Sequence, residues 1–185
     1  MQRDKAALDY HGLTQLEWLM SLLAPPELER AFVSVREHAQ LVGVHARFAC
    51  VRDSAEQVGP LAGILAAQAA YPHAAWLVLA CDLPFFDRSA LRRLINARAT
   101  DCDATAYRAP ASDLPEPLCA IYEPSSRAAL AAQAAKGNYS PQAFLRSARS
   151  AYITAEAAQT LANVNTPTQH QAALAELRAV HARVR

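Results

Sequence analysis

Residues 76–81 (WLVLAC) limit the folds open to this chain more than any other segment. Six consecutive apolar residues, rich in branched and aromatic side chains, predict a strand buried on both faces. Such strands are typical of parallel sheets that are covered by helices. Asp82 follows directly, and Pro84 prevents the strand from simply continuing. The chain therefore places a carboxylate where a buried strand leaves its sheet.

Strand-like and helix-like segments alternate along the rest of the chain. The capping box Thr14-Gln15-Leu16-Glu17 predicts a helix that ends before the prolines at 25 and 26. Further strands are expected at 31–35, 48–51, 103–107, 118–122 and 151–154, and further helices at 60–71, around 91–95, and at 126–136, 141–148 and from 167 onward. This alternation predicts an α/β fold with an open, mostly parallel sheet and helices on both faces. We expect a single domain over residues 1–185.

Composition excludes several classes of function. The formal net charge is +1 and no basic stripe is present, so nucleic-acid binding is not expected. The apolar runs are too short to cross a membrane, and no signal peptide is recognised, so a cytoplasmic protein is expected. The four cysteines are scattered and predict buried free thiols, and the six histidines have no metal-binding spacing.

Two carboxylates are predicted at the ligand-binding rim of the sheet. Asp82 and Asp53 each follow a strand, and ligands of such sheets bind beyond the carboxyl ends of the strands. Two interpretations fit Asp82. It is either a ligand of Mg²⁺, which takes one or two protein carboxylates, or an N-cap or Asx-turn residue before Pro84. The segment alone does not separate them.

Three weaker features accompany these acids. The segment 59–63 (GPLAG) predicts a tight entry into a helix, where backbone N–H groups face either a polar ligand or solvent. In 163–167 (NVNTP), Asn165 and Thr166 compete for the N-cap position, whereas Asn163 is not needed for capping and is freer to contact a ligand. Lys5, taken alone, is a solvated charge.

Five segments together resemble the MobA-type nucleotidyltransferases. These enzymes are molybdenum cofactor guanylyltransferases within the MobA-like NTP transferase superfamily. The segments, read in order, are RDKAALDYHG (3–12), VRDSAEQVGPLAGIL (51–65), WLVLACDLPFF (76–86), LPEPLCAIYEP (114–124) and LANVNTP (161–167). The resemblance implies a Rossmann-like fold and the transfer of a nucleoside monophosphate to an acceptor phosphate with release of pyrophosphate.

The resemblance also implies roles for individual residues. Asp82 would bind Mg²⁺, and Lys5 would neutralise charge on the triphosphate; both would be catalytic. The nucleotide would be contacted by Lys5, Asp82, Ser34, Asp53, Gly59, Pro60 and Gly63, although Ser34 stands where the family often has Asn. Asn163 and Asn165 would face the acceptor, with Asn165 near the metal.

The implied substrates are GTP and molybdopterin, with molybdoenzymes or other cofactor-biosynthesis proteins as further partners. The segment GPLAGI (59–64) resembles the members that transfer GMP, whereas the relatives that use CTP usually carry a Ser-rich segment there. A CTP-dependent transferase, a transferase with another acceptor, and a non-catalytic cofactor-delivery domain are the alternatives.

One departure from the family pattern affects the fold. The family begins with an apolar strand and a glycine-rich phosphate loop, and neither is found here. That strand is expected between 31–35 and 76–81, so we expect unpaired backbone groups at this position and an N-terminally truncated reading frame.

Overall fold

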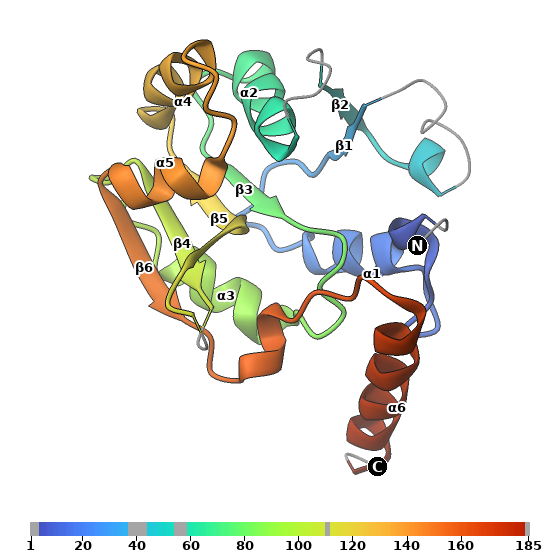
Figure 1. The fold of residues 1–185 in the computed structure, drawn as a ribbon. Helices are drawn as coiled ribbons and strands as arrows, with labels where there is room; N and C mark the ends of the chain where they lie inside the picture. The colour runs from blue at the N-terminus through green and yellow to red at the C-terminus, as the bar shows by residue number, and fades with distance from the viewer. Residues whose placement is uncertain (1–3, 37–43, 54–58, 110–111, 184–185) are drawn as a thin grey trace.

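The computed structural model describes residues 4–36, 44–53, 59–109 and 112–183. Six strands and six α-helices alternate much as expected (Figure 1). The strands are β1 (Val33–Val35), β2 (Cys50–Arg52), β3 (Trp76–Leu79), β4 (Ala104–Arg108), β5 (Pro115–Tyr122) and β6 (Ser150–Thr154). The helices are α1 (Gln15–Leu22), α2 (Pro60–Ala70), α3 (Arg88–Asn96), α4 (Ser126–Ala135), α5 (Pro141–Ser147) and α6 (Pro167–Arg183). Short 3₁₀ turns lie at η1 (Lys5–Ala7), η3 (His45–Arg47) and η4 (Ala158–Leu161).

The main sheet has the strand order β3-β5-β4-β6. β5 is antiparallel to both of its neighbours, and β4 is parallel to β6. Three of these four strands therefore run in one direction, and their carboxyl ends share one edge of the sheet.

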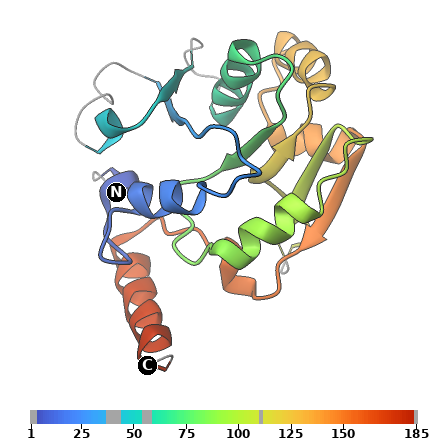
Figure 2. The ribbon, with the colours of Figure 1, turned by 180° about the vertical axis from the view of Figure 1, so that it is seen from behind.

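Helices cover both faces of this sheet, as predicted. On one face, α2, α4 and α5 pack on β4 and β5 through a cluster that includes Leu61, Leu130 and Phe144. On the other face lie α1 and α3, where Leu19 and Leu91 contact the sheet side chains (Figure 2). The α/β, Rossmann-like fold class is therefore confirmed. None of the described helices is long and apolar enough to span a membrane.

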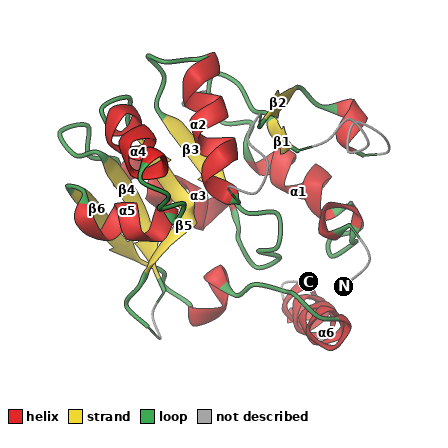
Figure 3. Ribbon diagram, turned by 45° about the horizontal axis from the view of Figure 1, so that its top comes forward, coloured by secondary structure: helices red, strands yellow, loops and turns green. Residues whose placement is uncertain are grey.

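β1 and β2 form a separate parallel pair, set apart from the main sheet (Figure 3). Within the described ranges no strand lies between β1 and β3. An aromatic triangle of Phe32, Tyr71 and Trp76 joins the two sheets, with ring centroids 5.5–5.9 Å apart.

The expectation that 76–81 is buried on both faces is wrong. Every residue of β3 is only half-buried, because β5 pairs with one edge of the strand and its other edge has no strand partner among the described residues. The cysteines are free, as expected, but only Cys119 is buried. Cys81 is exposed because β3 ends at Leu79 and the thiol lies in the following turn.

Local signals explain the start of several helices. Thr14 and Glu17 form the predicted capping box of α1. Gly59 precedes α2 with Pro60 at its first position, and Asp87 caps α3 by accepting a hydrogen bond from the Ala90 N–H. These caps satisfy backbone donors that have no partner inside the helix.

Candidate functional site

Three segments far apart in the sequence meet just beyond the carboxyl end of β3. Lys5 Nζ lies 3.0 Å from Asp82 Oδ2 and also donates a hydrogen bond to Asn165 Oδ1. Asp82 is 18% exposed and Lys5 is 32% exposed, so this ion pair is open to ligands from one side. Figure 1 shows the N-terminal turn beside the chain that leads into α6. We call Lys5, Asp82 and Asn165 the rim cluster.

The structure excludes the helix-cap interpretation of Asp82, and its role as a Mg²⁺ ligand stays a prediction. Asp87 is the N-cap of α3, so Asp82 does not cap that helix. Instead the Asp82 carboxylate accepts a hydrogen bond from Lys5, 77 positions away in the sequence. The side chain is therefore oriented toward other segments of the rim rather than toward its own turn.

Thr166 takes the N-cap role at α6, which leaves the Asn165 side chain available. The Gln169 N–H donates to Thr166 Oγ1, and Gln169 Oε1 accepts from the N–H groups of Thr166 and Asn165. Asn163 is exposed, and its side chain has no hydrogen-bond partner among the described residues. Its proposed contact with the acceptor stays a prediction.

The other predicted residues form a second group around β1, β2 and α2. A Cβ on Gly63 would lie 2.5 Å from Ser34 Oγ, so these two residues are in direct contact. Asp53 follows β2 with its side chain 5% exposed, at 3.9 Å from Arg36 Nε. Gly59 has φ 62° and ψ −149°, a conformation open almost only to glycine.

Two residues near Asp82 were not singled out from the sequence. Burial raises the pKa of Glu116, at the start of β5, and the negative charge of Asp82 raises it further. Burial and the same charge raise the pKa of Tyr10 to about 12, so this phenol stays protonated. Glu116 lies within a segment that carries the family resemblance, but only the pairing of β5 with β3 brings it to the rim.

The turn after β3 is held by contacts that the sequence does not reveal. The carbonyls of Asp82, Leu83 and Pro84 accept hydrogen bonds from Val164 N–H, Gln15 Nε2 and His11 Nε2 at 3.0, 3.2 and 3.0 Å. In the sequence, Gln15 and His11 precede the strands of the main sheet, and Val164 follows them. No periodicity or motif predicted this convergence.

A family profile decides the relationship of the chain to known proteins. The profile of the MobA-like NTP transferase domain matches residues 1–157. The chain belongs to this family. The match includes Lys5, Ser34, Asp53 and Asp82, whereas Asn163 and Asn165 lie beyond it.

Individual MobA-like relatives agree with this assignment. The molybdenum cofactor biosynthesis bifunctional protein of Synechocystis sp. is 30% identical over 170 residues, which are 92% of this chain and 49% of that protein. A molybdenum cofactor guanylyltransferase of Pseudomonas aeruginosa is 35% identical over 95 residues, which are 51% of this chain and 48% of the relative. The chain thus spans about half the length of these two relatives. A Pseudomonas syringae guanylyltransferase is 28% identical over 166 residues, or 89% of this chain and 82% of the relative.

Solved structures share the MobA-like fold. Molybdopterin-guanine dinucleotide biosynthesis protein A from Archaeoglobus fulgidus superposes with a TM-score of 0.77 at 23% identity, covering 96% of this chain and 92% of the other. The 2-C-methyl-D-erythritol 4-phosphate cytidylyltransferase of Thermus thermophilus gives 0.71 at 19% identity, with 94% of each chain covered. At these identities the likeness concerns the fold.

The rim cluster suits a cation that binds together with a polyanionic substrate. Within the described ranges, no three His, Cys, Asp or Glu residues gather as a metal site of their own. Asp82 and Asn165 offer two side-chain oxygens at one point, both bonded to Lys5. Mg²⁺ is usually held by one or two protein carboxylates together with water and substrate phosphates, so these residues fit it.

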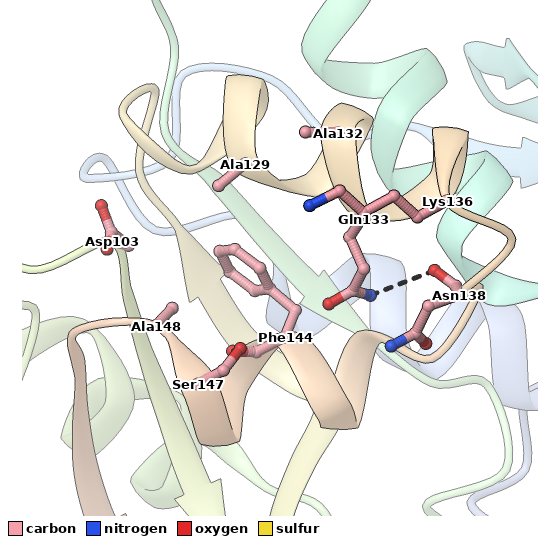
Figure 4. Close-up of a pocket in the computed structure, with 9 residues that line it drawn as sticks. All are labelled: Asp103, Ala129, Ala132, Gln133, Lys136, Asn138, Phe144, Ser147 and Ala148. Atoms are coloured by element: carbon pink, nitrogen blue, oxygen red, sulfur yellow. Dashed lines mark hydrogen bonds between the residues drawn. The ribbon is translucent and has the colours of Figure 1, made fainter.

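A pocket lies elsewhere on the molecule. Figure 4 shows it between α4 and α5, with Phe144 at its floor and Lys136 at its rim. Asp103, which also lines it, precedes β4, whereas Asp82 follows β3, which runs in the same direction. The pocket is therefore at the opposite end of the sheet from the rim cluster, and none of the predicted site residues lines it.

Proposed function

We propose that this chain transfers GMP from GTP to the phosphate of molybdopterin and releases pyrophosphate. Membership of the MobA-like family and the guanylyltransferase names of its relatives support the reaction class. The observation that carries the proposal is the rim cluster, where Lys5 Nζ lies 3.0 Å from Asp82 Oδ2 beyond the end of β3. It places one cation and one carboxylate where ligands of such sheets bind.

The chemistry requires charge neutralisation more than covalent catalysis. An acceptor phosphate oxygen attacks the α-phosphorus of GTP, a new P–O bond forms, and the bond to the β-phosphate oxygen breaks. Both reactants are polyanions, so their repulsion must be reduced and their approach held in line. Mg²⁺ bound at Asp82 would supply positive charge for this purpose.

In this scheme Lys5 changes partner when nucleotide binds. Without substrate its ammonium neutralises Asp82 and holds Asn165. With GTP and the cation present, Lys5 would contact the phosphates, and Asp82 and Asn165 would hold the cation. Asn163, exposed on the same segment, contacts the acceptor.

We assign the nucleoside to the second group of residues. Ser34 and Gly63 approach closely between β1 and α2, and Asp53 follows β2. Gly59 and Pro60 form the entry into α2. The sequence GPLAGI at 59–64 favours guanine over cytosine.

Calorimetry and a transfer assay test the proposal. We expect the chain to bind GTP only with Mg²⁺, to discriminate against CTP, and to form the GMP–molybdopterin product. Asp82→Asn should abolish both activities while circular dichroism stays unchanged. Asp101→Asn is the matched control, because Asp101 is exposed and lies near the opposite end of the sheet.

Two outcomes contradict the proposal. Transfer at the wild-type rate by Asp82→Asn would remove Asp82 from the reaction. Binding of molybdopterin by a wild-type chain that binds neither GTP nor CTP would instead support a cofactor-delivery domain.

A further inference from the structure

The turn formed by residues 82–84 is anchored at every carbonyl. Val164 N–H, Gln15 Nε2 and His11 Nε2 each donate to one of its three successive carbonyls, at 3.0–3.2 Å. The turn carries Asp82 but lies outside any strand or helix, so its own backbone does not fix the direction of the carboxylate. The three bonds therefore determine where Asp82 points.

Gln15 connects both partners of the Lys5–Asp82 ion pair. Its backbone N–H donates to Leu8 O at 2.7 Å, and Leu8 N–H in turn bonds Lys5 O. Its side-chain Nε2 donates to Leu83 O, next to Asp82. One residue thus links the turn that carries the ammonium to the turn that carries the carboxylate.

Burying the Gln15 side chain has a cost in folding free energy. Gln15 is fully buried at the start of α1, and its Oε1 has no hydrogen-bond partner among the described residues. An unsatisfied buried amide oxygen destabilises a fold, and an apolar side chain of similar size would avoid that cost. Compared with such an apolar side chain, the Gln15 amide adds the hydrogen bond to Leu83 O.

His11 holds the same turn from the other side. Its ring stacks on Trp18 with centroids 4.0 Å apart and an interplanar angle of 22°, and its Nε2 donates to Pro84 O. Trp18 belongs to α1, the helix that begins with Gln15. α1 therefore controls two of the three anchors.

We infer that Gln15 is a positioning residue for the reaction proposed above. By holding Leu83 it keeps the Asp82 carboxylate directed at Lys5 and at the cation that accompanies the nucleotide. Groups that orient a metal ligand commonly change metal affinity or activity by about 10–100-fold when they are removed. His11 supports the same turn. The inference rests on the proposed function for its catalytic consequence only.

The test compares two buried glutamines. Gln15→Met keeps length, helix propensity and volume but removes the donor. Gln68→Met is the matched control, since Gln68 is also buried in a helix, donates Nε2 to Ser126 Oγ, and has an unpartnered Oε1. We expect similar losses of thermal stability in both variants. Only Gln15→Met should raise the Mg²⁺ concentration for half-maximal GTP binding, by about 10–100-fold, and lower kcat with little change in the KM for molybdopterin.

Amide hydrogen exchange provides a readout that does not depend on activity. The Val164 N–H, bonded to Asp82 O, should exchange faster in Gln15→Met than in Gln68→Met, and faster also in His11→Phe, which retains a ring against Trp18. Equal Mg²⁺ dependence and equal Val164 exchange in the two methionine variants would overturn the inference. If the wild type binds no nucleotide, the proposed function fails, and Val164 exchange alone then decides whether Gln15 holds the turn.

Discussion

Asp82 acquires its surroundings from residues remote in the sequence. Lys5 bonds this carboxylate from near the start of the chain, and Asn165, near its end, accepts a hydrogen bond from the same Lys5 ammonium. Glu116 brings a second carboxyl group to the same edge, and burial raises its pKa. A local turn signal and a ligand-binding role looked alike in the sequence. The structure shows Asp82 paired with Lys5 while Asp87 caps α3, and the Mg²⁺ role stays a prediction.

Glu116 predicts a dependence of stability on pH. Because its folded-state pKa is raised above 4.5, the folded state holds more protons than the unfolded state between 4.5 and the folded pKa. Stability therefore falls as pH rises through that window. Glu116→Gln removes this loss, so its advantage over the wild type in urea unfolding should be larger at about pH 7 than at about pH 4. An advantage that does not depend on pH would contradict this assignment.

Lys5 should matter more for binding than for stability. The ion pair is partly exposed, so Lys5→Met should change the free energy of unfolding by at most about 1 kcal/mol. The same variant should weaken Mg²⁺–GTP binding measured by calorimetry, because one neutralising charge is lost from the rim. The control is Lys136→Met at the opposite end of the sheet. Equal nucleotide affinity in the two variants would argue against the proposed role of Lys5.

Helix α2 illustrates how an element depends on the conformation of its first residues. Gly59 precedes the helix at φ 62°, where a Cβ would have open space but a strained backbone. Gly63 lies one turn later in ordinary helical conformation, where a Cβ would meet only the rotatable Ser34 hydroxyl. A Cβ would therefore have different consequences at the two positions.

Alanine at these two positions should have opposite effects on folding. Gly59→Ala should lower the free energy of unfolding by about 1–3 kcal/mol through backbone strain. Gly63→Ala should raise it by up to about 1 kcal/mol, the usual helical preference for alanine over glycine, with the full gain in a Ser34→Ala background. Urea unfolding of Gly59→Ala, Gly63→Ala, Ser34→Ala and the Ser34→Ala/Gly63→Ala double variant measures both effects. A loss at Gly63 that persists without the Ser34 hydroxyl would show that something other than Ser34 limits the space there.

At the scale of the whole molecule, two sheets are held together by side chains rather than by strand pairing. β1 and β3 belong to separate sheets, and β3 is apolar yet only half-buried. Phe32, Tyr71 and Trp76 connect the residue before β1, the end of α2 and the start of β3.

Loss of one aromatic ring from this triangle should lower the free energy of unfolding of the protein. Phe32→Leu removes two ring contacts, and aromatic pairs contribute about 0.5–1.5 kcal/mol each beyond their buried area, so we expect a loss of about 1–2 kcal/mol. Tyr139→Leu is the control; this ring is 46% exposed, and a change within about 0.5 kcal/mol is expected. Urea unfolding followed by the fluorescence of Trp18 and Trp76 would report both. Equal changes would show that the triangle does not join the sheets.

Much of the fold was predictable because its signals are local. Capping at Thr14, proline at the start of α2 and the apolar period of each segment depend on neighbours a few residues apart, and the corresponding helices and strands form as expected. The burial of β3 was not predictable in this way. An apolar strand is buried only if partners occupy both of its edges, and pairing is a property of the assembled sheet.

The sequence by itself determined the element order, the family and the placement of Asp82 at the end of a strand. Tertiary structure decided what surrounds that carboxylate. Lys5, Asn165, Glu116 and the anchors Gln15 and His11 lie 34 to 83 positions from Asp82 in the sequence. Contacts over such separations follow from how strands pair and helices pack, and neither periodicity nor spacing encodes them directly.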